Sequence, residues 1–360
     1  MGSRDHTFSD LKPGQQATLF PSLGYFDLKK NRWRAQVHGR VYDGARVPIG
    51  TRILLRGLKR AMQATPEDVA SETFQKRIDG FLTTPGRRRR IVLQIHNHYY
   101  RLRRRTRRNG AFYGTLSLPT EAVKSCLHEH SLGLSGSSPA MPMHLVVASN
   151  DHRASVQSDV YLTPPVGISI ISDIDDTIKL TDATSRREML ANTFLRPFAA
   201  VDGMATLYQL WQQQGCHFHY VSSSPWELYE SLAELCTAVQ FPAGSMHLRY
   251  FRVRDEMFKR FRPVRRNSKV GIIAGILKRL PQRRFVLIGD SGEKDPEIYR
   301  FLAKRFPERI AAILIRNLAA KPLSDKRLQK LKALDSNVQV TVFETPEQIA
   351  GIVPLVISNQ

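Results

Sequence analysis

Two aspartates separated by one residue are the part of this sequence best suited to covalent chemistry. Asp173 and Asp175 follow an apolar run, residues 166–171, where a buried strand is expected to give way to a loop. In open α/β sheets, ligands bind outside the carboxyl ends of the strands. Asp173 could therefore attack a phosphorus atom as a nucleophile, and Asp175 could protonate the leaving oxygen. An acidic pair after a strand can also serve only solvation or capping, so its role depends on the segments that follow.

A polar segment, Ser222-Ser223-Ser224-Pro225-Trp226-Glu227, follows the next apolar run, residues 217–221. Its last four residues have the form of a capping box with proline at the first helical position, which predicts Ser224 as a helix cap. Ser222 then lies beside a helix N-terminus, whose free N–H groups attract anions. We predict that Ser222 hydrogen-bonds a phosphate oxygen and that Ser223 is a further substrate contact.

A lysine and two more aspartates complete the set of candidate residues. Lys269 stands just before an apolar helical pattern, residues 270–280, although many lysines in such positions are only solvated. Asp290 ends a third apolar strand pattern in a glycine-flanked turn, which suits a hard cation such as Mg²⁺. Asp295 precedes Pro296 and could be either a metal ligand or the cap of the next helix.

The order of these segments resembles that of the haloacid-dehalogenase-like phosphohydrolases. The sequence has D-x-D-x-T after one strand, serine after a second, lysine at a helix start and GD-x-x-x-x-D after a third strand. The surrounding residues narrow the resemblance to the actin-patch-associated phosphatidate phosphatases, over roughly residues 164–320. The segments that carry it are residues 166–179, 192–194 with 197–198, 203–204, 220–226 and 288–299.

The resemblance implies a role for each candidate residue. Asp173 corresponds to the aspartyl-phosphate nucleophile and Asp175 to the general acid and then base. Ser222 and Lys269 correspond to phosphate-binding groups, and Asp290 to the Mg²⁺ ligand. Mg²⁺ and the lysine together would neutralise the repulsion between an ionised nucleophile and a phosphate dianion.

Four further expectations concern the residues around the nucleophile. Asp173, Asp175 and Asp295 are expected to share in the metal site. Thr177 is expected to orient its loop and contact the substrate. The nearby charge of Asp173 and partial burial would favour a protonated Asp175. Asp176 is expected to face the solvent.

The 360 residues predict two domains with a boundary at Pro164-Pro165. Beyond it, apolar strands alternate with helical patterns, which is typical of a parallel sheet with helices on both faces. We therefore predict a haloacid-dehalogenase-like Rossmannoid α/β domain over residues 164–360. A smaller β-rich domain, a sandwich or barrel, is predicted over residues 21–163, after a tail over residues 1–20.

The β-rich part is predicted from alternating or β-branched stretches. These are Trp33–Tyr42, Thr51–Leu58, Ile91–Leu102, Ala111–Leu118, His144–Ser149 and Val156–Leu162. Asn109-Gly110 predicts a hairpin turn between residues 99–108 and 111–118. Ala70–Phe81 could be a short helix or a loop insertion. The short intervals between the motifs leave little room for a large cap, so an open site is expected unless the N-terminal domain supplies a lid.

The chain is strongly basic, with a formal net charge of +22. Its densest runs, Arg87–Arg90 and Arg101–Arg108, flank one strand pattern and would form one patch if the strands pair. Such a patch would attract anionic lipid surfaces, by about 1 kcal/mol per basic residue, or nucleic acid, or would simply be solvated. The three cysteines indicate no disulfide framework. With neither a spanning apolar run nor a secretion core, the expected location is cytoplasmic and peripheral at a membrane.

These observations favour a Mg²⁺-dependent phosphatase that acts on a phosphomonoester, most specifically phosphatidate, to give diacylglycerol at a membrane surface. Two alternatives stay open. One is a phosphatase of polynucleotide ends or of a soluble phosphate ester. The other is a non-catalytic module that binds membranes or nucleic acid through its basic surface. The oligomeric state is not indicated by the sequence.

Overall fold

The computed structural model describes residues 8–44, 49–132, 138–147, 156–181, 186–249, 269–353 and 356. The chain divides into two compact units. The first comprises Met1–Arg52, Phe81–Pro164 and Ala243–Met246, and the second comprises Ile53–Gly80, Pro165–Pro242 and His247–Gln360. One division falls between Pro164 and Pro165. Residues 53–80 belong to the second unit, although they stand between strands of the first unit in the sequence.

The first unit contains a nine-stranded sheet with the order β1-β3-β2-β9-β8-β5-β6, and β4 and β7 also pair with β3. Its pairs are antiparallel except for β2 with β9. The strands are β1 (Gln15–Leu19), β2 (Ser22–Asp27), β3 (Arg32–Asp43), β4 (Thr84–Pro85), β5 (Val92–Ile95), β6 (His98–Arg101), β7 (Ala111–Ser117), β8 (Ala140–Leu145) and β9 (Gln157–Thr163). Helix α4 (Thr120–Ser131) lies between β7 and β8 in the sequence.

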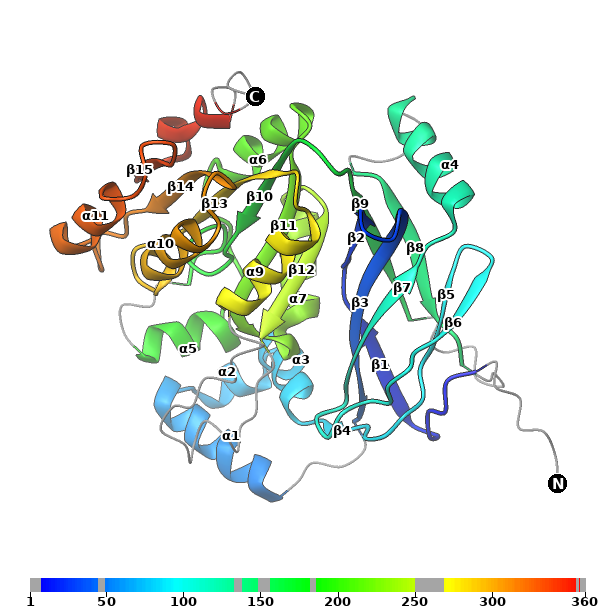
Figure 1. Cartoon of the computed structure of the whole chain (residues 1–360). Helices are drawn as coiled ribbons and strands as arrows, with labels where there is room; N and C mark the ends of the chain where they lie inside the picture. The colour runs from blue at the N-terminus through cyan, green and yellow to red at the C-terminus, as the bar shows by residue number, and fades with distance from the viewer. Residues whose placement is uncertain are drawn as a thin grey trace. The chain divides into compact units, whose positions relative to one another are not determined.

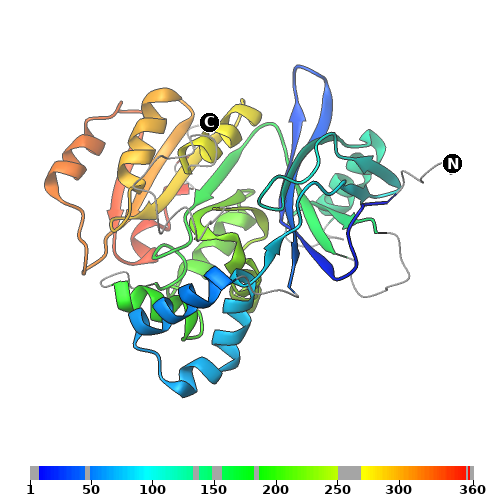
Figure 2. The same ribbon diagram turned by 90° about the horizontal axis from the view of Figure 1, so that it is seen from below.

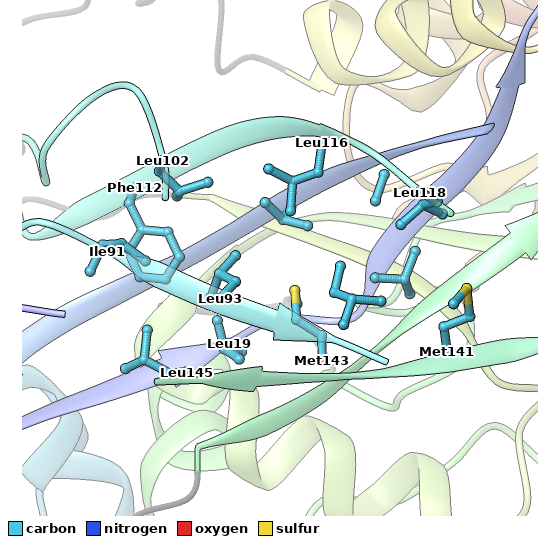
Figure 3. Packing of buried hydrophobic residues seen from close by; sticks show 14 of the residues in the cluster. Leu19, Ile91, Leu93, Leu102, Phe112, Leu116, Leu118, Met141, Met143 and Leu145 are labelled. Carbon is cyan, nitrogen blue, oxygen red and sulfur yellow. The ribbon is translucent and has the colours of Figure 1, made fainter. Parts of the chain in front are cut away.

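The inner faces of these strands share one hydrophobic cluster (Figure 3). Leu93 of β5, Phe112 of β7 and Leu145 of β8 are all buried in it. Alternate residues of a strand point to opposite faces, so one apolar face per strand is enough to build this core. The region agrees with the β-rich domain expected from the sequence, although β1 lies within the residues predicted to be a tail.

Two predicted strands of this region are wrong. Residues 51–58 lie in helix α1 (Ile49–Met62), because the apolar residues from 49 to 62 recur at helical rather than alternating intervals. Residues 91–102 form two strands rather than one, since the backbone turns at His96, whose φ is 52°. The resulting β5–β6 hairpin pairs Val92 with Arg101.

The hairpin predicted at Asn109-Gly110 is also wrong. The turn itself forms, with Gly110 at φ 79° and its N–H donated to the Arg107 carbonyl oxygen at 3.0 Å. However, β7 pairs with β3, in a register that sets Gly39 opposite Phe112. The absence of a side chain at Gly39 leaves room for the Phe112 ring, so β3 accepts this partner where a bulkier residue would clash.

The second unit is built on a six-stranded sheet with the order β12-β11-β10-β13-β14-β15. The pairs from β11 to β15 are parallel. The strands are β10 (Ile168–Ser172), β11 (His217–Pro225), β12 (Gly244–Arg249), β13 (Arg284–Asp290), β14 (Ile310–Arg316) and β15 (Gln339–Phe343). The order reverses between β10 and β13, and this is the point at which such sheets bind ligands.

Helices cover both faces of this sheet, as the sequence predicted (Figure 1). In Figure 2, the yellow and orange helices α9 and α10 lie on one side of the sheet and the green helices on the other. The bounds are α5 (Arg186–Phe194), α6 (Met204–Gln213), α7 (Tyr229–Ala238), α9 (Lys269–Arg279), α10 (Asp295–Arg305) and α11 (Asp325–Lys332), with short 3₁₀ turns at Trp226–Leu228 and Pro346–Ile349. Helices α2 (Pro66–Ala70) and α3 (Glu72–Phe81) come from the earlier segment. Residues 70–81, left open between helix and loop, are therefore mainly helical.

In the part of the chain that the structure describes, no helix combines the length and the apolar character that crossing a bilayer requires.

Candidate active site

The candidate active site lies at the carboxyl ends of two adjacent strands, β10 and β13. Ser172 is in register with Ile288, so the residue after β10 and the last residue of β13 meet at the same edge. Asp173 continues the ladder by donating its N–H to the Ile288 carbonyl oxygen at 2.9 Å. The side chains of Asp173 and Asp290 are both buried. Their closeness therefore follows from the strand order and register.

Asp295 joins these two residues from the start of α10. One carboxylate oxygen of each of Asp173, Asp290 and Asp295 lies within 4.8 Å of the others. Asp295 is the first residue of α10 rather than its cap, since Lys294 holds the cap position, so the capping alternative is wrong. Its Oδ2 accepts a hydrogen bond from the Tyr299 hydroxyl at 3.4 Å. We refer to Asp173, Asp290 and Asp295 as the carboxylate cluster.

Lys269 brings a cation to the carboxylate cluster. It is the first residue of α9, a helix held against the sheet by its buried Ile273, Ile276 and Leu277. Its Nζ lies 2.8 Å from Asp173 Oδ1 and also forms an ion pair with Asp295. Burial alone would lower the pKa of Lys269, but the charges of Asp173 and Asp295 raise it above its usual range. Lys269 is therefore held as a cation.

The site carries more negative than positive charge. Burial, followed by the neighbouring Asp295, raises the pKa of Asp290 to about 6. Burial also raises the pKa of Glu293 to about 7, against the attraction of Lys269. The pKa of Asp173 is raised well above its usual range by burial, with Lys269 opposing and the other carboxylates adding to the shift. Four acidic side chains thus crowd one lysine, and Glu293 is a member that the sequence reasoning did not single out.

The unsatisfied oxygens of the carboxylate cluster fit a second cation. Asp173 Oδ2, Asp290 Oδ2 and Asp295 Oδ1 are buried, and none accepts a hydrogen bond from the described residues, although Asp295 Oδ1 forms the ion pair with Lys269. Asp290 Oδ1, in contrast, accepts the N–H groups of Gly292 at 2.6 Å and Glu293 at 2.9 Å. These two bonds fix the carboxylate and leave its other oxygen for a ligand. An all-oxygen donor set with excess negative charge suits Mg²⁺.

Asp175 is placed differently from the expectation that it joins the metal site and is protonated. Its Oδ1 lies 2.9 Å from Lys179 Nζ and accepts the Thr181 hydroxyl at 2.9 Å. Its Oδ2 accepts the hydroxyls of Ser222 at 3.1 Å and Ser224 at 2.5 Å. Burial alone would raise the pKa of Asp175, but the Lys179 charge and these donors lower it to about 2. In this arrangement Asp175 is a carboxylate, and it is not among the three residues of the carboxylate cluster.

Two serines of β11 reach Asp175, and the third does not. Strand β11 continues to Pro225, and Ser222 and Ser224 therefore point to the same face. The prediction of Ser224 as a helix cap is wrong, because its hydroxyl binds Asp175 and no side chain caps the turn that follows. Ser222 is at the site, with its hydroxyl engaged by Asp175. Ser223, half-buried on the other face, makes no side-chain hydrogen bond to any described residue.

The loop after Asp173 is folded tightly on itself. The Asp176 N–H donates to the Lys179 carbonyl oxygen at 2.7 Å, and Asp176 has a φ of 52°. The expectation that Asp176 faces solvent is wrong. Its side chain is 7% exposed and its Oδ1 accepts the Thr181 N–H at 2.8 Å, which closes the loop. The buried Thr177 hydroxyl has no hydrogen-bond partner among the described residues, so it is available to a ligand.

An arginine from α3 supports this loop through α5. The Arg77 guanidinium donates to the carbonyl oxygens of Thr193 at 2.8 Å and Arg196 at 2.6 Å, at the end of α5. The Asn192 amide in turn donates to the Thr181 carbonyl oxygen at 2.8 Å. Positive charge is favourable at a helix C-terminus. Helix α3, from the segment 53–80, thus stabilises the loop that holds Asp175.

The doubly wound sheet, with an aspartate after its first strand and further carboxylates and a lysine at its switch point, is typical of the haloacid-dehalogenase-like fold. Residues 168–317 match a family model described as "Phosphatidate phosphatase APP1, catalytic domain". The match, with the 40% identical yeast relative described below, confirms the resemblance seen in the sequence over this region.

Two curated proteins illustrate the relationship. Phosphatidate phosphatase APP1 of Saccharomyces cerevisiae is 40% identical over 156 residues, which cover 42% of this chain and 26% of the yeast protein. An uncharacterized protein of Schizosaccharomyces pombe is 33% identical over 194 residues, covering 52% of this chain and 32% of that protein. The chain thus spans about a quarter to a third of the length of these relatives.

Among solved structures, an uncharacterized protein from Listeria monocytogenes serotype 4b aligns over 53% of this chain and 99% of its own, with 15% identity and a TM-score of 0.35. A likeness at that score adds no argument about this chain.

Proposed function

We propose that this chain is a Mg²⁺-dependent phosphatase that hydrolyses a phosphomonoester through an aspartyl-phosphate on Asp173. One observation carries the proposal: neither carboxylate oxygen of Asp173, a buried aspartate at a strand end, accepts a hydrogen bond from the described residues, so one oxygen can attack while the other contacts a cation. Such an oxygen is oriented and desolvated, as a nucleophile must be. The match to the family model adds independent support, since its description names a phosphatase.

The proposed reaction has two steps. In the first, an Asp173 oxygen attacks phosphorus, the bond between phosphorus and the ester oxygen breaks, and Asp175 gives a proton to the leaving oxygen. In the second, water attacks the phosphorus of the aspartyl-phosphate while Asp175 accepts a proton from it. Phosphate leaves and Asp173 returns as a carboxylate. Lys269 stabilises the negative charge of the phosphoryl oxygens throughout.

The surroundings of Asp175 favour the second of these steps. With Lys179 at 2.9 Å and a pKa of about 2, Asp175 is ready to accept a proton from water. To act as an acid in the first step, it must carry a proton and give up its contact with Lys179. We therefore assign Lys179, Thr181 and Ser224 as positioning residues that return Asp175 to its carboxylate form.

Asp173, Asp290 and Asp295 would hold the Mg²⁺, for the reasons of charge and unsatisfied oxygens given above. When bound, the ion would supply Lewis-acid stabilisation of charge on the phosphoryl group. The orienting bonds from Gly292 and Glu293 to Asp290 would keep that ligand in place.

The proposed substrate is phosphatidate at a membrane surface, with diacylglycerol as product. The support is the family description and the basic runs Arg87–Arg90 and Arg101–Arg108 of the first unit. These runs lie together: the Arg88 N–H donates to the Thr106 carbonyl oxygen at 3.1 Å, and Thr106 donates its N–H to the Arg89 carbonyl oxygen at 2.8 Å. One basic patch of this kind is attracted to anionic lipid.

A substrate panel tests the proposal. Phosphate release is measured from phosphatidate vesicles, a soluble chromogenic phosphomonoester and end-phosphorylated oligonucleotides, each with Mg²⁺ or with EDTA. We expect Mg²⁺-dependent release from phosphatidate, loss of release in Asp173→Asn, and an acid-stable phosphoenzyme only in the unsubstituted chain. Phosphate release from the oligonucleotides and from no other substrate would show that the substrate is a polynucleotide end and not a lipid. Full activity of Asp173→Asn would remove the covalent mechanism.

A further inference from the structure

The first unit contains a cavity lined by arginines. It has a volume of about 580 Å³ and lies along β7 and the segment that follows β6. Arg101, Arg103, Arg104, Arg105 and Arg107 line it, and its lining includes no acidic side chain. We call it the arginine cavity. Five cations around one hollow repel one another unless an anion is present.

The segment that displays these arginines is fixed at both ends. Leu102 and Thr106 are buried, at 4% and 3% exposure. The Thr106 hydroxyl donates to the Gly86 carbonyl oxygen at 2.6 Å and accepts the Arg89 N–H at 2.8 Å. Arg103, Arg104 and Arg105 lie between these anchors and are exposed. The backbone is thus held in place while the arginine side chains stay exposed along the cavity.

Arg105 has a counter-charge and Arg107 is positioned by an aromatic ring, whereas the other three cavity arginines have neither kind of partner among the described residues. Arg105 pairs with Asp10 at 2.8 Å and donates to the Arg88 carbonyl oxygen at 3.0 Å. Arg107 stacks over the Tyr113 ring, with 4.7 Å from its Cζ to the ring centroid. Arg101, Arg103 and Arg104 have no ion-pair partner among the described residues. An anionic ligand can neutralise the charge of these three arginines.

The chemistry of the arginine cavity favours a phosphate monoester. The guanidinium fork binds two oxygens of one phosphate at once. A monoester carries a charge of about −1.5 to −2 at neutral pH and presents three terminal oxygens, more than a phosphodiester can offer. Close to these arginines, Tyr99 of β6 is 56% exposed. Tyrosine is favoured where an apolar membrane interior meets water, which indicates a lipid source for the phosphate.

We propose that the arginine cavity is a second phosphate-binding site, which takes the phosphate-monoester headgroup of a membrane lipid. This goes beyond the proposed function, because the site belongs to the first unit and does not require the second unit to be a phosphatase. It also differs from diffuse attraction to a charged surface. A diffuse patch responds to surface charge alone, whereas this site distinguishes a monoester from a diester.

Binding of the full-length chain to vesicles tests the proposal, with Asp173→Asn in every sample so that no lipid is consumed. Phosphatidylcholine vesicles contain either phosphatidate or phosphatidylglycerol, adjusted to equal surface potential. We expect about tenfold tighter binding to phosphatidate, the order of difference that one well-formed bidentate contact supplies. Glycerol 3-phosphate is titrated separately to detect a soluble ligand, and single-stranded DNA to detect a nucleic-acid partner.

Three sets of substitutions identify the site. R101Q/R103Q/R104Q removes three cavity charges, and K29Q/K30Q/R32Q removes three exposed charges elsewhere in the first unit. Only the first set should abolish the preference for phosphatidate. R101K/R103K/R104K keeps the charge but loses the fork, and it should lose the preference while retaining salt-sensitive binding. This third set also keeps the test decisive if the first one misfolds.

The outcomes separate the proposal from its rivals. Equal binding to both vesicle types by the Asp173→Asn chain with all its arginines in place means diffuse charge only and overturns the proposal. Loss of the preference in the control set as well would place the site elsewhere. Binding of glycerol 3-phosphate as tight as that of phosphatidate vesicles would make a soluble ester the ligand, and displacement from vesicles by single-stranded DNA at low concentration would favour nucleic acid. None of these readouts depends on catalytic activity.

Discussion

The carboxylate of Asp295 occupies the space that a side chain at Gly289 would need. A Cβ placed on Gly289 would lie 2.7 Å from Asp295 Cγ, closer than non-bonded carbon atoms approach. Asp295 is fully buried and its Oδ1 pairs with Lys269. Because Gly289 has no side chain, the Asp295 carboxylate of α10 can reach the end of β13.

We expect Gly289→Ala to displace Asp295 and weaken Mg²⁺ binding by about 10- to 100-fold, the cost usual for disturbing the support of a metal ligand. Isothermal titration with Mg²⁺ measures this directly. Gly57→Ala is the control, since Gly57 lies in α1 and a Cβ there meets nothing within 4 Å. Unchanged Mg²⁺ affinity in a folded Gly289→Ala would argue against Asp295 as a ligand.

Mg²⁺ affinity should fall as the pH is lowered through 6. The pKa of Asp290 is raised to about 6, mainly by burial, and a carboxylate must lose its proton to bind a metal. Protons therefore compete below that pH, and the loss should approach about tenfold per pH unit. Titrations at several pH values measure it. Asp290→Asn should bind weakly at every pH, and an affinity that does not change with pH would contradict the assignment.

Ser224→Ala should lower kcat by about tenfold to a hundredfold, the range expected when a catalytic group is misplaced. It removes one of the two serine hydroxyls bonded to Asp175 Oδ2. Ser223→Ala is the matched control, because Ser223 lies on the other face of β11, and it should change kcat by less than about twofold. A large loss in Ser223→Ala would instead support the substrate contact predicted from the sequence.

Arg77→Ala should destabilise the second unit by about 2 kcal/mol, because part-buried carbonyl oxygens at the end of α5 lose a charged donor. Urea unfolding measures the change. Lys76→Ala is the neighbouring control: Lys76 pairs with Glu234, but both side chains are substantially exposed, at 43% and 59%. Such a pair contributes less than about 1 kcal/mol. If the two substitutions lowered the free energy of unfolding equally, Arg77 would not be a specific support of the Asp175 loop.

Sequence patterns place Asp173, Lys269 and Asp290 at the ends of apolar segments, and the structure brings these three residues together. Their placement was predictable because strand ends and helix starts can be recognised from local sequence. In a parallel sheet the carboxyl ends of the strands then lie at one edge. The environment of Asp175 was not predictable in this way. Its bonds to Ser222 and Ser224 join residues 47 and 49 positions apart. They depend on β11 continuing to Pro225, past the apolar run that ends at residue 221.

The first unit was harder to predict for the same physical reason. The pairing of β7 with β3 joins distant segments, whereas the Asn109-Gly110 signal is purely local and competes with it. Helix α1 was taken as a strand because β-branched and aliphatic residues are common to buried elements of both kinds. The roles of Arg77 and Lys179 lay outside any local pattern, since their partners are set by tertiary packing.

The interleaving of the two units in the sequence has a consequence for synthesis of the chain. Residues 53–80, with Arg77, emerge from the ribosome long before α5 exists to receive their hydrogen bonds, and residues 243–246 of the first unit emerge after nearly half of the second. Domains usually fold as units, starting from the N-terminus, as they are made. Here the first unit cannot be completed until residue 246 has been made, when nearly half of the second unit already exists, so we expect folding of the two units to overlap during synthesis.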